Sequence, residues 1–290
     1  MYAGNPVCCL TNPFLGHEAE PLEKVEEPKK VMVIGGGVAG LSAAFIAKER
    51  GHEVTLYEAG DVLGGNMRLA AYPPGKGDIT NMIRSYIHRC QKDGVKIVMN
   101  CEVTPELIKE EKPDSVIIAT GSKTLILPIE GIDNPAIIHG SDLLDGKRAA
   151  GKKVLVVGGG MVGCETAAFL GEQEHDVTVI EFRDTVGADV IHEHRVYLMK
   201  DFEDYGIKEI TGAKVCKFYE DGVEYETADG VRHESRGYDS VILSMGFRNY
   251  NPLEEKIKDL VPETHVIGDA IRARRALDAT KEAYEVASRI

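Results

Sequence analysis

Two glutamates, Glu58 and Glu181, are the residues best placed to do chemistry, because each lies 18 positions after the last glycine of a G-x-G-x-x-G turn. The turn glycines are Gly35, Gly37 and Gly40 in the first pattern and Gly158, Gly160 and Gly163 in the second. The first glycine permits a tight turn, the second lets the backbone approach a pyrophosphate, and the third lets a helix pack on a strand. A pyrophosphate then meets the unpaired N–H groups of the helix, and the glutamate accepts hydrogen bonds from a ribose diol. Each pattern therefore predicts a dinucleotide site.

These two patterns belong to an internal repeat. Shifting the chain by 123 positions aligns residues 30–58 with residues 153–181, and 13 of the 29 positions are identical. Each copy predicts an apolar strand (31–34 and 154–157), a glycine turn, a helix and a second strand that ends in glutamate. Ordinary glycine turns would not reproduce this whole context twice. From Lys30 onward, short apolar strands alternate with helix-length segments, so the fold class is α/β with two Rossmann-like domains.

Composition narrows the possible partners. The 290 residues are 43% hydrophobic and include 31 glycines, which suffices for two packed domains. A formal charge of −13 disfavours nucleic acid and anionic membrane surfaces as partners, and no apolar run approaches the roughly 20 residues that span a bilayer. We therefore expect a soluble, cytoplasmic protein. The six cysteines show neither a disulfide framework nor a C-x-x-C pair, which argues against a disulfide reductase.

The surroundings of the two copies differ. The first copy is followed by the glycine pair Gly64 and Gly65, which would let a loop run close along an extended cofactor. Farther on, strand 115–121 ends in Ala-Thr-Gly and strand 265–269 ends in Gly-Asp. Beside the second copy we expect no such neighbours, neither a loop like that of Gly64 and Gly65 nor these strand endings. Taken singly, each ending is as consistent with a purely structural role as with cofactor binding: a strand-ending turn for Thr120 and Gly121, and an Asx turn with a helix cap for Gly268 and Asp269.

In this order, the signatures resemble the two-dinucleotide flavoprotein family that includes thioredoxin reductase and the disulfide reductases. In that family the first unit binds FAD and the second binds NAD(P)H. The resemblance implies that Asp269 hydrogen-bonds the ribityl chain of FAD and that Val103 holds the adenine through its backbone. It also implies that a helix beginning near Ala276 points its positive N-terminus at the flavin.

The resemblance carries over to a full set of candidate binding residues. For FAD they are Gly35, Gly37, Val38, Ala39, Gly40, Glu58, Ala59, Gly65, Asn66, Met67, Val103, Ala119, Thr120, Gly121, Gly268, Asp269, Ala276 and Leu277. For NADH they are Gly158, Gly160, Met161, Val162, Gly163, Glu181, Phe182 and Gly246. NADH is favoured over NADPH because Glu181 would repel a 2'-phosphate. Arg183 keeps the alternative open, since it lies two residues later and could cover a phosphate.

The N-terminal segment is similar to the joint between two halves of 2,4-dienoyl-CoA reductase, enoate reductases and trimethylamine dehydrogenase. The residues that carry this similarity are 9–13 (CLTNP) and 16–18 (GHE). In those enzymes a cysteine before such an Asn-Pro is the last of four ligands of a four-iron four-sulfur cluster, and Cys9 occupies that place. The flavin barrel and the other three cysteines would precede Cys9, and one cysteine cannot hold the cluster. We expect either a C-terminal portion of a longer polypeptide or a stand-alone version, in which Cys9 is a free thiol.

The resemblance implies an oxidoreductase module that passes a hydride from NADH to FAD. The electrons would continue to an iron-sulfur and FMN domain of the same polypeptide or of a partner chain, and would reduce an activated C=C bond of an enoate or enoyl-CoA. Two alternatives are a non-catalytic nucleotide-binding scaffold, as in trimethylamine dehydrogenase, and a disulfide reductase. The expected domains are a linker over 1–29, an FAD domain over 30–147 and 246–290, and an NAD domain over 148–245.

Overall fold

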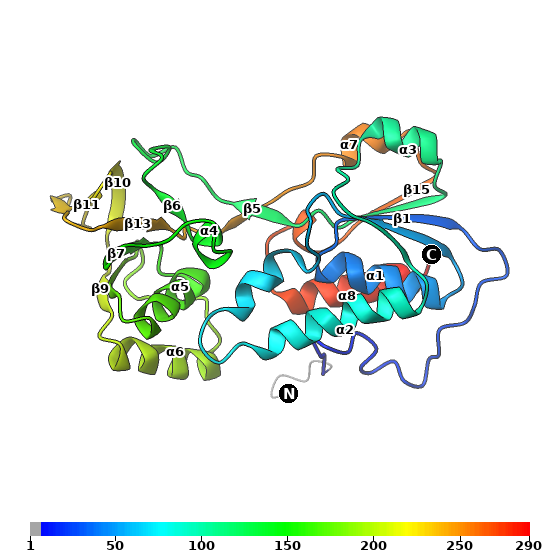
Figure 1. Cartoon of the computed structure of the whole chain (residues 1–290), viewed down its shortest axis with the longest axis horizontal. Coiled ribbons are helices and arrows are strands. Elements are labelled where there is room, and N and C mark those ends of the chain that lie inside the picture. Colours follow the sequence, from blue (N-terminus) through cyan, green and yellow to red (C-terminus); the bar gives the residue numbers. More distant parts are fainter. Residues whose placement is uncertain (1–6) are drawn as a thin grey trace. The chain divides into compact units, whose positions relative to one another are not determined.

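The computed structural model describes residues 7–290, and the chain divides into two compact units (Figure 1). Unit 1 comprises the described part of Met1–Ala71 together with Asp78–Lys123 and Arg248–Ile290, and unit 2 comprises Tyr72–Gly77 and Thr124–Phe247. Unit 1 contains the first copy of the repeat and unit 2 contains the second. Each unit is a Rossmann-like α/β domain, so the predicted fold class is confirmed.

Unit 1 is built on a five-stranded parallel sheet with the order β15-β4-β1-β2-β3. Its strands are β1 (Lys30–Ile34), β2 (Glu53–Tyr57), β3 (Lys96–Val98), β4 (Ser115–Ile118) and β15 (Glu263–Val266). Its helices are α1 (Val38–Glu49), α2 (Asp78–Lys92), α3 (Pro105–Glu111), α7 (Glu254–Ile257) and α8 (Ala276–Ala287), with the 3-10 helices η1 (Gly65–Ala71) and η2 (Gly268–Ala270).

Helices cover both faces of this sheet. The side chains of each strand alternate between the two faces, and on both faces they are apolar and need to be buried. Val31 and Val33 of β1 point into a core shared with α1, α2 and α8. Met32 and Ile34 point into the opposite core, which α3 and α7 close. Figure 1 shows α1 packed beside α8 and α2 on one side of the sheet. Burial on both faces explains why β1 is an unbroken apolar run.

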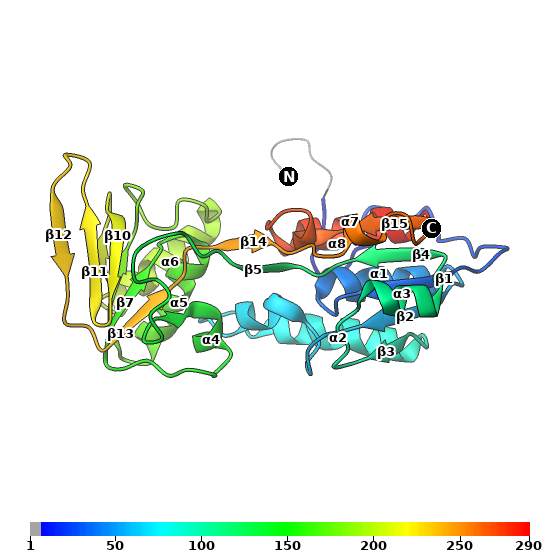
Figure 2. The same ribbon diagram turned by 90° about the horizontal axis from the view of Figure 1, so that it is seen from above.

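Unit 2 has a five-stranded parallel sheet with the order β6-β13-β7-β8-β9. Four of its strands repeat those of unit 1, but its edge strand β6 precedes β7 in the chain, whereas the edge strand β15 of unit 1 comes last. Its strands are β6 (Ile138–His139), β7 (Lys153–Val157), β8 (Asp176–Ile180), β9 (Lys208–Ile210) and β13 (Ser240–Leu243), and its helices are α4 (Gly140–Leu144), α5 (Met161–Glu172) and α6 (His192–Asp204). An antiparallel meander of β10 (Lys214–Tyr219), β11 (Gly222–Glu226) and β12 (Arg232–Ser235) covers the face opposite α5 (Figure 2).

The structure moves both predicted domain boundaries. Unit 2 begins at Thr124 rather than at 148, because β6 pairs with β13 and α4 packs on α5. It ends at Phe247 rather than at 245. The chain passes between the units through β5 (Ser122–Thr124) and β14 (Phe247–Asn249), which pair with each other. Segment 72–77 also belongs to unit 2, where Lys76 forms an ion pair with the buried carboxylate of Glu165.

The segment predicted as a linker instead packs on unit 1 over its described part, residues 7–29. Phe14 stacks on Phe45 with ring centroids 6.3 Å apart and meets Tyr284 edge-on at 5.6 Å. The Tyr86 hydroxyl donates to the Leu10 carbonyl oxygen at 2.7 Å. The Arg89 guanidinium lies 4.7 Å from the centroid of the Phe14 ring. The segment is mostly polar and charged, which favours a linker, but its few apolar side chains hold it against unit 1.

We expect Phe14→Ala to lower the free energy of unfolding of unit 1 by about 2 kcal/mol, less than for a fully buried ring because Phe14 is half-buried. Urea denaturation followed by circular dichroism would measure this change. Leu260→Ala is a matched control, because Leu260 lies in unit 1 with 37% of its surface exposed. Equal midpoints for both variants would show that the segment does not stabilise the unit.

Candidate dinucleotide sites

Two glycines in each turn leave no room for a side chain. In unit 1, a Cβ on Gly35 would lie 2.3 Å from the Ala119 carbonyl oxygen, and one on Gly40 would lie 1.9 Å from the Gly35 carbonyl oxygen. In unit 2, a Cβ on Gly158 would lie 2.4 Å from the Ser244 carbonyl oxygen, and one on Gly163 would lie 1.8 Å from the Gly158 carbonyl oxygen. Gly35 and Gly158 also have φ of +109° and +104°, which side chains disfavour. These four glycines bring each helix N-terminus onto the carboxyl end of its sheet.

The middle glycine of the first turn faces open space. Gly37 is the N-cap of α1, and apart from Gly37 itself and its two chain neighbours no heavy atom of the described chain lies within 4 Å of its ideal Cβ position. Val38 and Ala39 follow it as the first helical residues, and a helix of this length carries partial positive charge at its N-terminus. The cradle fits a pyrophosphate, because backbone N–H groups face a space that any side chain would fill.

Each glutamate at the end of its second strand also holds the glycine turn. In unit 1, Oε2 of Glu58 accepts the N–H of Gly36 at 2.7 Å and Oε1 accepts the N–H of Gly60 at 2.7 Å. In unit 2, Oε2 of Glu181 accepts the N–H of Gly159 at 2.6 Å and Oε1 accepts that of Arg183 at 2.9 Å. A carboxylate oxygen can accept a second hydrogen bond, so both groups stay available to ribose hydroxyls.

Further FAD candidates in unit 1 are linked through a residue that the sequence analysis missed. The side-chain amide of Asn66 donates to the carbonyl oxygen of Ser122 at 3.2 Å. The Ser122 hydroxyl donates to Oδ2 of Asp269 at 2.9 Å, and Oδ1 of Asp269 accepts the N–H of Arg274 at 3.0 Å. The structure therefore brings Asn66 and Asp269 together. The sequence does not indicate a role for Ser122, because Ser122 and Asp269 lie almost 150 positions apart in the chain.

The Ala-Thr-Gly ending of β4 is held by hydrogen bonds to Tyr250, just after the chain re-enters unit 1. The Thr120 hydroxyl donates to the Tyr250 carbonyl oxygen, and the Gly121 carbonyl oxygen accepts the N–H of Tyr250 at 2.9 Å. Gly121 has φ of +72°, which favours glycine, and Ala119 is buried under the first turn. Thr120 thus serves a structural contact with its side chain and leaves only its backbone to face a ligand.

The remaining FAD candidates differ in their surroundings. Gly65 packs on Gly37, since a Cβ on Gly65 would lie 3.1 Å from the Gly37 Cα. The Val103 side chain is buried and Met67 packs against the core, whereas Ala59 is exposed. The N–H of Gly268 donates to Oε2 of Glu282 at 2.7 Å. Ala276 and Leu277 are half-buried at the start of α8.

The second turn opens into a cavity of about 310 Å³ that lies wholly within unit 2. The predicted NADH residues that line it are Gly158, Gly160, Met161, Val162, Glu181, Phe182 and Gly246. Gly163 does not line it, because that glycine packs on the turn beneath. The Phe182 side chain is 68% exposed, which suits a ring that an adenine would stack on. Arg183 and Asp189 also line the cavity, and Asp189 is not among the binding residues predicted from the sequence.

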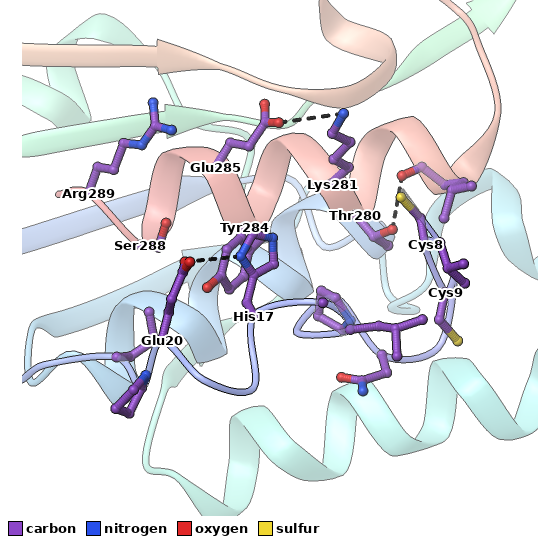
Figure 3. A pocket seen from close by; sticks show the side chains of 18 of the residues that line it. Cys8, Cys9, His17, Glu20, Thr280, Lys281, Tyr284, Glu285, Ser288 and Arg289 are labelled. Carbon is purple, nitrogen blue, oxygen red and sulfur yellow. Dashed lines mark hydrogen bonds and ion pairs between the residues drawn. The ribbon is translucent and has the colours of Figure 1, made fainter. Parts of the chain in front are cut away.

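A larger cavity, of about 560 Å³, contains neither glycine turn (Figure 3). It lies between the N-terminal segment and α8, and Cys8 and Cys9 line it. The His17 ring stacks on Tyr284 with centroids 4.3 Å apart and forms part of its wall. Among residues 7–290 no three histidine, cysteine or acidic side chains gather as a metal site. The role of Cys9 as a cluster ligand therefore stays a prediction.

The buried thiols are poor nucleophiles. Burial raises the pKa of both Cys90 and Cys164 to about 12, so both stay protonated at neutral pH. None of the six cysteines forms a disulfide. Over the described part of the chain, no helix has the length and apolar character to cross a membrane.

Comparison with known proteins agrees with this geometry. The family model described as "Pyridine nucleotide-disulphide oxidoreductase" matches residues 29–267. A cinnamate reductase of Clostridium sporogenes is 34% identical over 98% of this chain and 43% of its own length. An NADH oxidase of Thermoanaerobacter brockii is 34% identical over 97% of this chain and 44% of its own length.

A solved 2-naphthoyl-CoA reductase is similar in structure as well. Its TM-score is 0.92 at 32% identity, over 98% of this chain and 43% of that protein. This chain thus spans less than half the length of the three relatives described. They support the inferred resemblance to NADH:flavin oxidoreductases. The residues matched by the family model include both glycine turns and both glutamates, and we conclude that the chain belongs to the pyridine nucleotide-disulphide oxidoreductase family.

Proposed function

We propose that this chain is the module of a larger reductase that binds FAD in unit 1 and NADH in unit 2. Bound FAD would supply the redox chemistry by accepting a hydride from NADH and passing the electrons onward. The observation that carries the proposal is the pair of repeat-related turns, each with a helix N-terminus and a glutamate held beside it. The relatives named as reductases and as an NADH oxidase support the same oxidoreductase class.

The assignment of FAD to unit 1 is supported by its longer polar track. The open cradle at Gly37 and the chain Asn66–Ser122–Asp269 offer contacts beyond one nucleotide, which an extended flavin dinucleotide needs. The cavity of unit 2 is lined by Glu181 and Phe182 and offers contacts to an adenosine and a pyrophosphate. The protein residues bind and orient the two cofactors, and none of them is required as an acid or base.

The electron acceptor lies outside the residues described. We propose a domain of the same polypeptide or of a partner chain, carrying FMN and a four-iron four-sulfur cluster to which Cys9 contributes one thiolate. The exposure of Cys8 and the partial exposure of Cys9 beside a cavity leave that segment accessible. The names cinnamate reductase and 2-naphthoyl-CoA reductase support an unsaturated carboxylate or thioester as final substrate.

Two other functions fit less well. A disulfide reductase needs a pair of reactive cysteines, but Cys90 and Cys164 are buried with raised pKa values. A non-catalytic scaffold that only holds a nucleotide would not need Glu181 and the second cavity. One observation favours the scaffold: the Asp189 carboxylate already accepts the N–H of Met161 at the N-terminus of α5, where the pyrophosphate of a dinucleotide would bind.

The first test is the visible absorption spectrum of the purified chain reconstituted with FAD. We expect flavin bands that bleach when NADH is added without oxygen, because the hydride would reduce the bound flavin. Gly37→Val is the matched variant, since its side chain would fill the cradle, and it should lose the flavin. A wild-type chain that retains only an adenine nucleotide would refute the redox function and leave the scaffold.

The choice of nicotinamide cofactor can be tested at Glu181. We expect the wild-type chain to bind NADH at least roughly tenfold more tightly than NADPH, because the carboxylate opposes a 2'-phosphate. Glu181→Gln should reduce this ratio, since an amide oxygen can still accept the Gly159 N–H but carries no charge. Glu193→Gln removes the same charge from an exposed position on α6 and should leave the ratio unchanged. Tighter binding of NADPH by the wild type would assign the deciding role to Arg183.

Thiol labelling tests the case against disulfide chemistry. In the native chain near pH 8, where an unperturbed thiol of pKa about 8.5 is partly ionised, we expect Cys90 and Cys164 to resist alkylation. Cys8 should react first because it is exposed. Mass spectrometry of the digested protein would locate the label, and urea-unfolded protein is the control in which all six cysteines react. Rapid labelling of Cys90 or Cys164 would reopen the disulfide reductase alternative.

A further inference from the structure

The repeat extends beyond the two glutamates. The offset of 123 also pairs Gly64 with Gly187 and Asn66 with Asp189. The structure supports this register, because the N–H of Gly64 donates to the Gly36 carbonyl oxygen at 2.8 Å and that of Gly187 donates to the Gly159 carbonyl oxygen at 2.7 Å. The second copy therefore has a loop like that of the first, contrary to our expectation from sequence, with Ala188 in place of the second glycine.

The equivalent residues of the two loops, Asn66 and Asp189, differ in charge and in the groups that they contact. Oδ1 of Asp189 accepts the N–H of Met161, the first residue of α5, at 2.9 Å. Its Oδ2 lies 3.3 Å from the ideal Cβ position of Gly160. The carboxylate thus lies over the glycine and the N–H group that a pyrophosphate would use. In unit 1 the equivalent Asn66 is neutral and donates its amide to Ser122, and the space at Gly37 stays open.

The backbone of the loop that carries Asp189 is held in place by contacts on both sides of that residue. Arg195 of α6 donates to the Thr185 hydroxyl at 2.8 Å and to the Val186 carbonyl oxygen at 3.0 Å. Val186 is fully buried and Val190 is also buried, so the core holds the loop on both sides of the carboxylate. The Asp189 side chain itself is exposed toward the cavity that it lines. None of these anchors involves the Asp189 carboxylate.

We propose that Asp189 is an internal competitor of the dinucleotide pyrophosphate, which weakens binding in unit 2 so that NADH exchanges while FAD is retained in unit 1. The inference rests on the proposed function and adds a residue that sets affinity. A helix N-terminus favours one negative group, and a pyrophosphate arriving there must either displace the carboxylate or bind beside a like charge. A hydride donor has to leave after each turnover, whereas a flavin that is reoxidised in place does not.

The test is the affinity of the 290-residue chain for ADP-ribose, measured by titration calorimetry. Asp189→Asn removes the charge while its amide oxygen can still accept the N–H of Met161, so the fold should be unaffected. We expect the variant to bind ADP-ribose roughly three- to tenfold more tightly. Adenosine, which has no phosphate, should bind wild type and variant alike. Asp189→Ser, which puts another small polar side chain without charge at this exposed position, provides a second variant if the first does not fold.

Two controls separate this effect from a general change in charge. Asp184→Asn removes the same charge from the same loop, away from the α5 N-terminus, and should leave ADP-ribose affinity unchanged. Asn66→Asp places the carboxylate in unit 1, and we expect it to weaken FAD retention by a comparable factor. Raising the salt concentration should shrink the difference between wild type and Asp189→Asn, because the competition is electrostatic.

The outcomes distinguish this inference from the proposed function. If wild type binds ADP-ribose and Asp189→Asn binds it equally or more weakly, the competitor role is wrong and the NADH site stands. An equal gain for Asp189→Asn and Asp184→Asn would also overturn the role, since net charge alone would explain it. If neither wild type nor any variant binds ADP-ribose, the NADH site itself is refuted and this inference fails with it.

Discussion

The structure depends on a close backbone approach that only glycine permits. Because Gly40 and Gly163 lie directly on the carbonyl oxygens of Gly35 and Gly158, each helix begins immediately beside the strand that precedes it. The positive helix end then lies at the carboxyl edge of the sheet, where the second strand delivers its glutamate. Any side chain at these positions would push the helix away and separate the groups that a dinucleotide bridges. The rest of each unit supports this contact.

The elements of this contact were predictable from sequence because they are local. A turn of six residues, an apolar strand and a glutamate 18 positions later are all set by short-range sterics and spacing. The structure places Glu58 and Glu181 against their turns, as the pattern indicated, and four strands follow the same order in both sheets, β4-β1-β2-β3 and β13-β7-β8-β9. Buried parallel strands read as continuous apolar runs, so the fold class was equally accessible.

What sequence reasoning missed depends on contacts between distant segments. Phe14 lies in a stretch dominated by charge, and only its aromatic partners reveal that this stretch packs on unit 1. The early start of unit 2 follows from the pairing of β6, whose two residues show no periodicity, with β13. Ser122 and Asp189 are common residue types in loops, and their roles emerge only when folding brings them to Asp269 and to α5.

Duplication of one unit leaves the two sites with the same frame and different electrostatics. In unit 1 the Glu58 carboxylate holds the glycine turn, and neutral Asn66, at the position equivalent to Asp189, donates to Ser122, which in turn donates to Asp269. In unit 2 a second carboxylate, Asp189, takes up the partial positive charge that α5 would offer to a phosphate. The proposed binding of NADH there would rely more on contacts without charge, such as the exposed ring of Phe182 and the backbone of the turn. On this proposal, the site would favour recognition of adenosine over tight capture of phosphate, which suits a ligand that must be released.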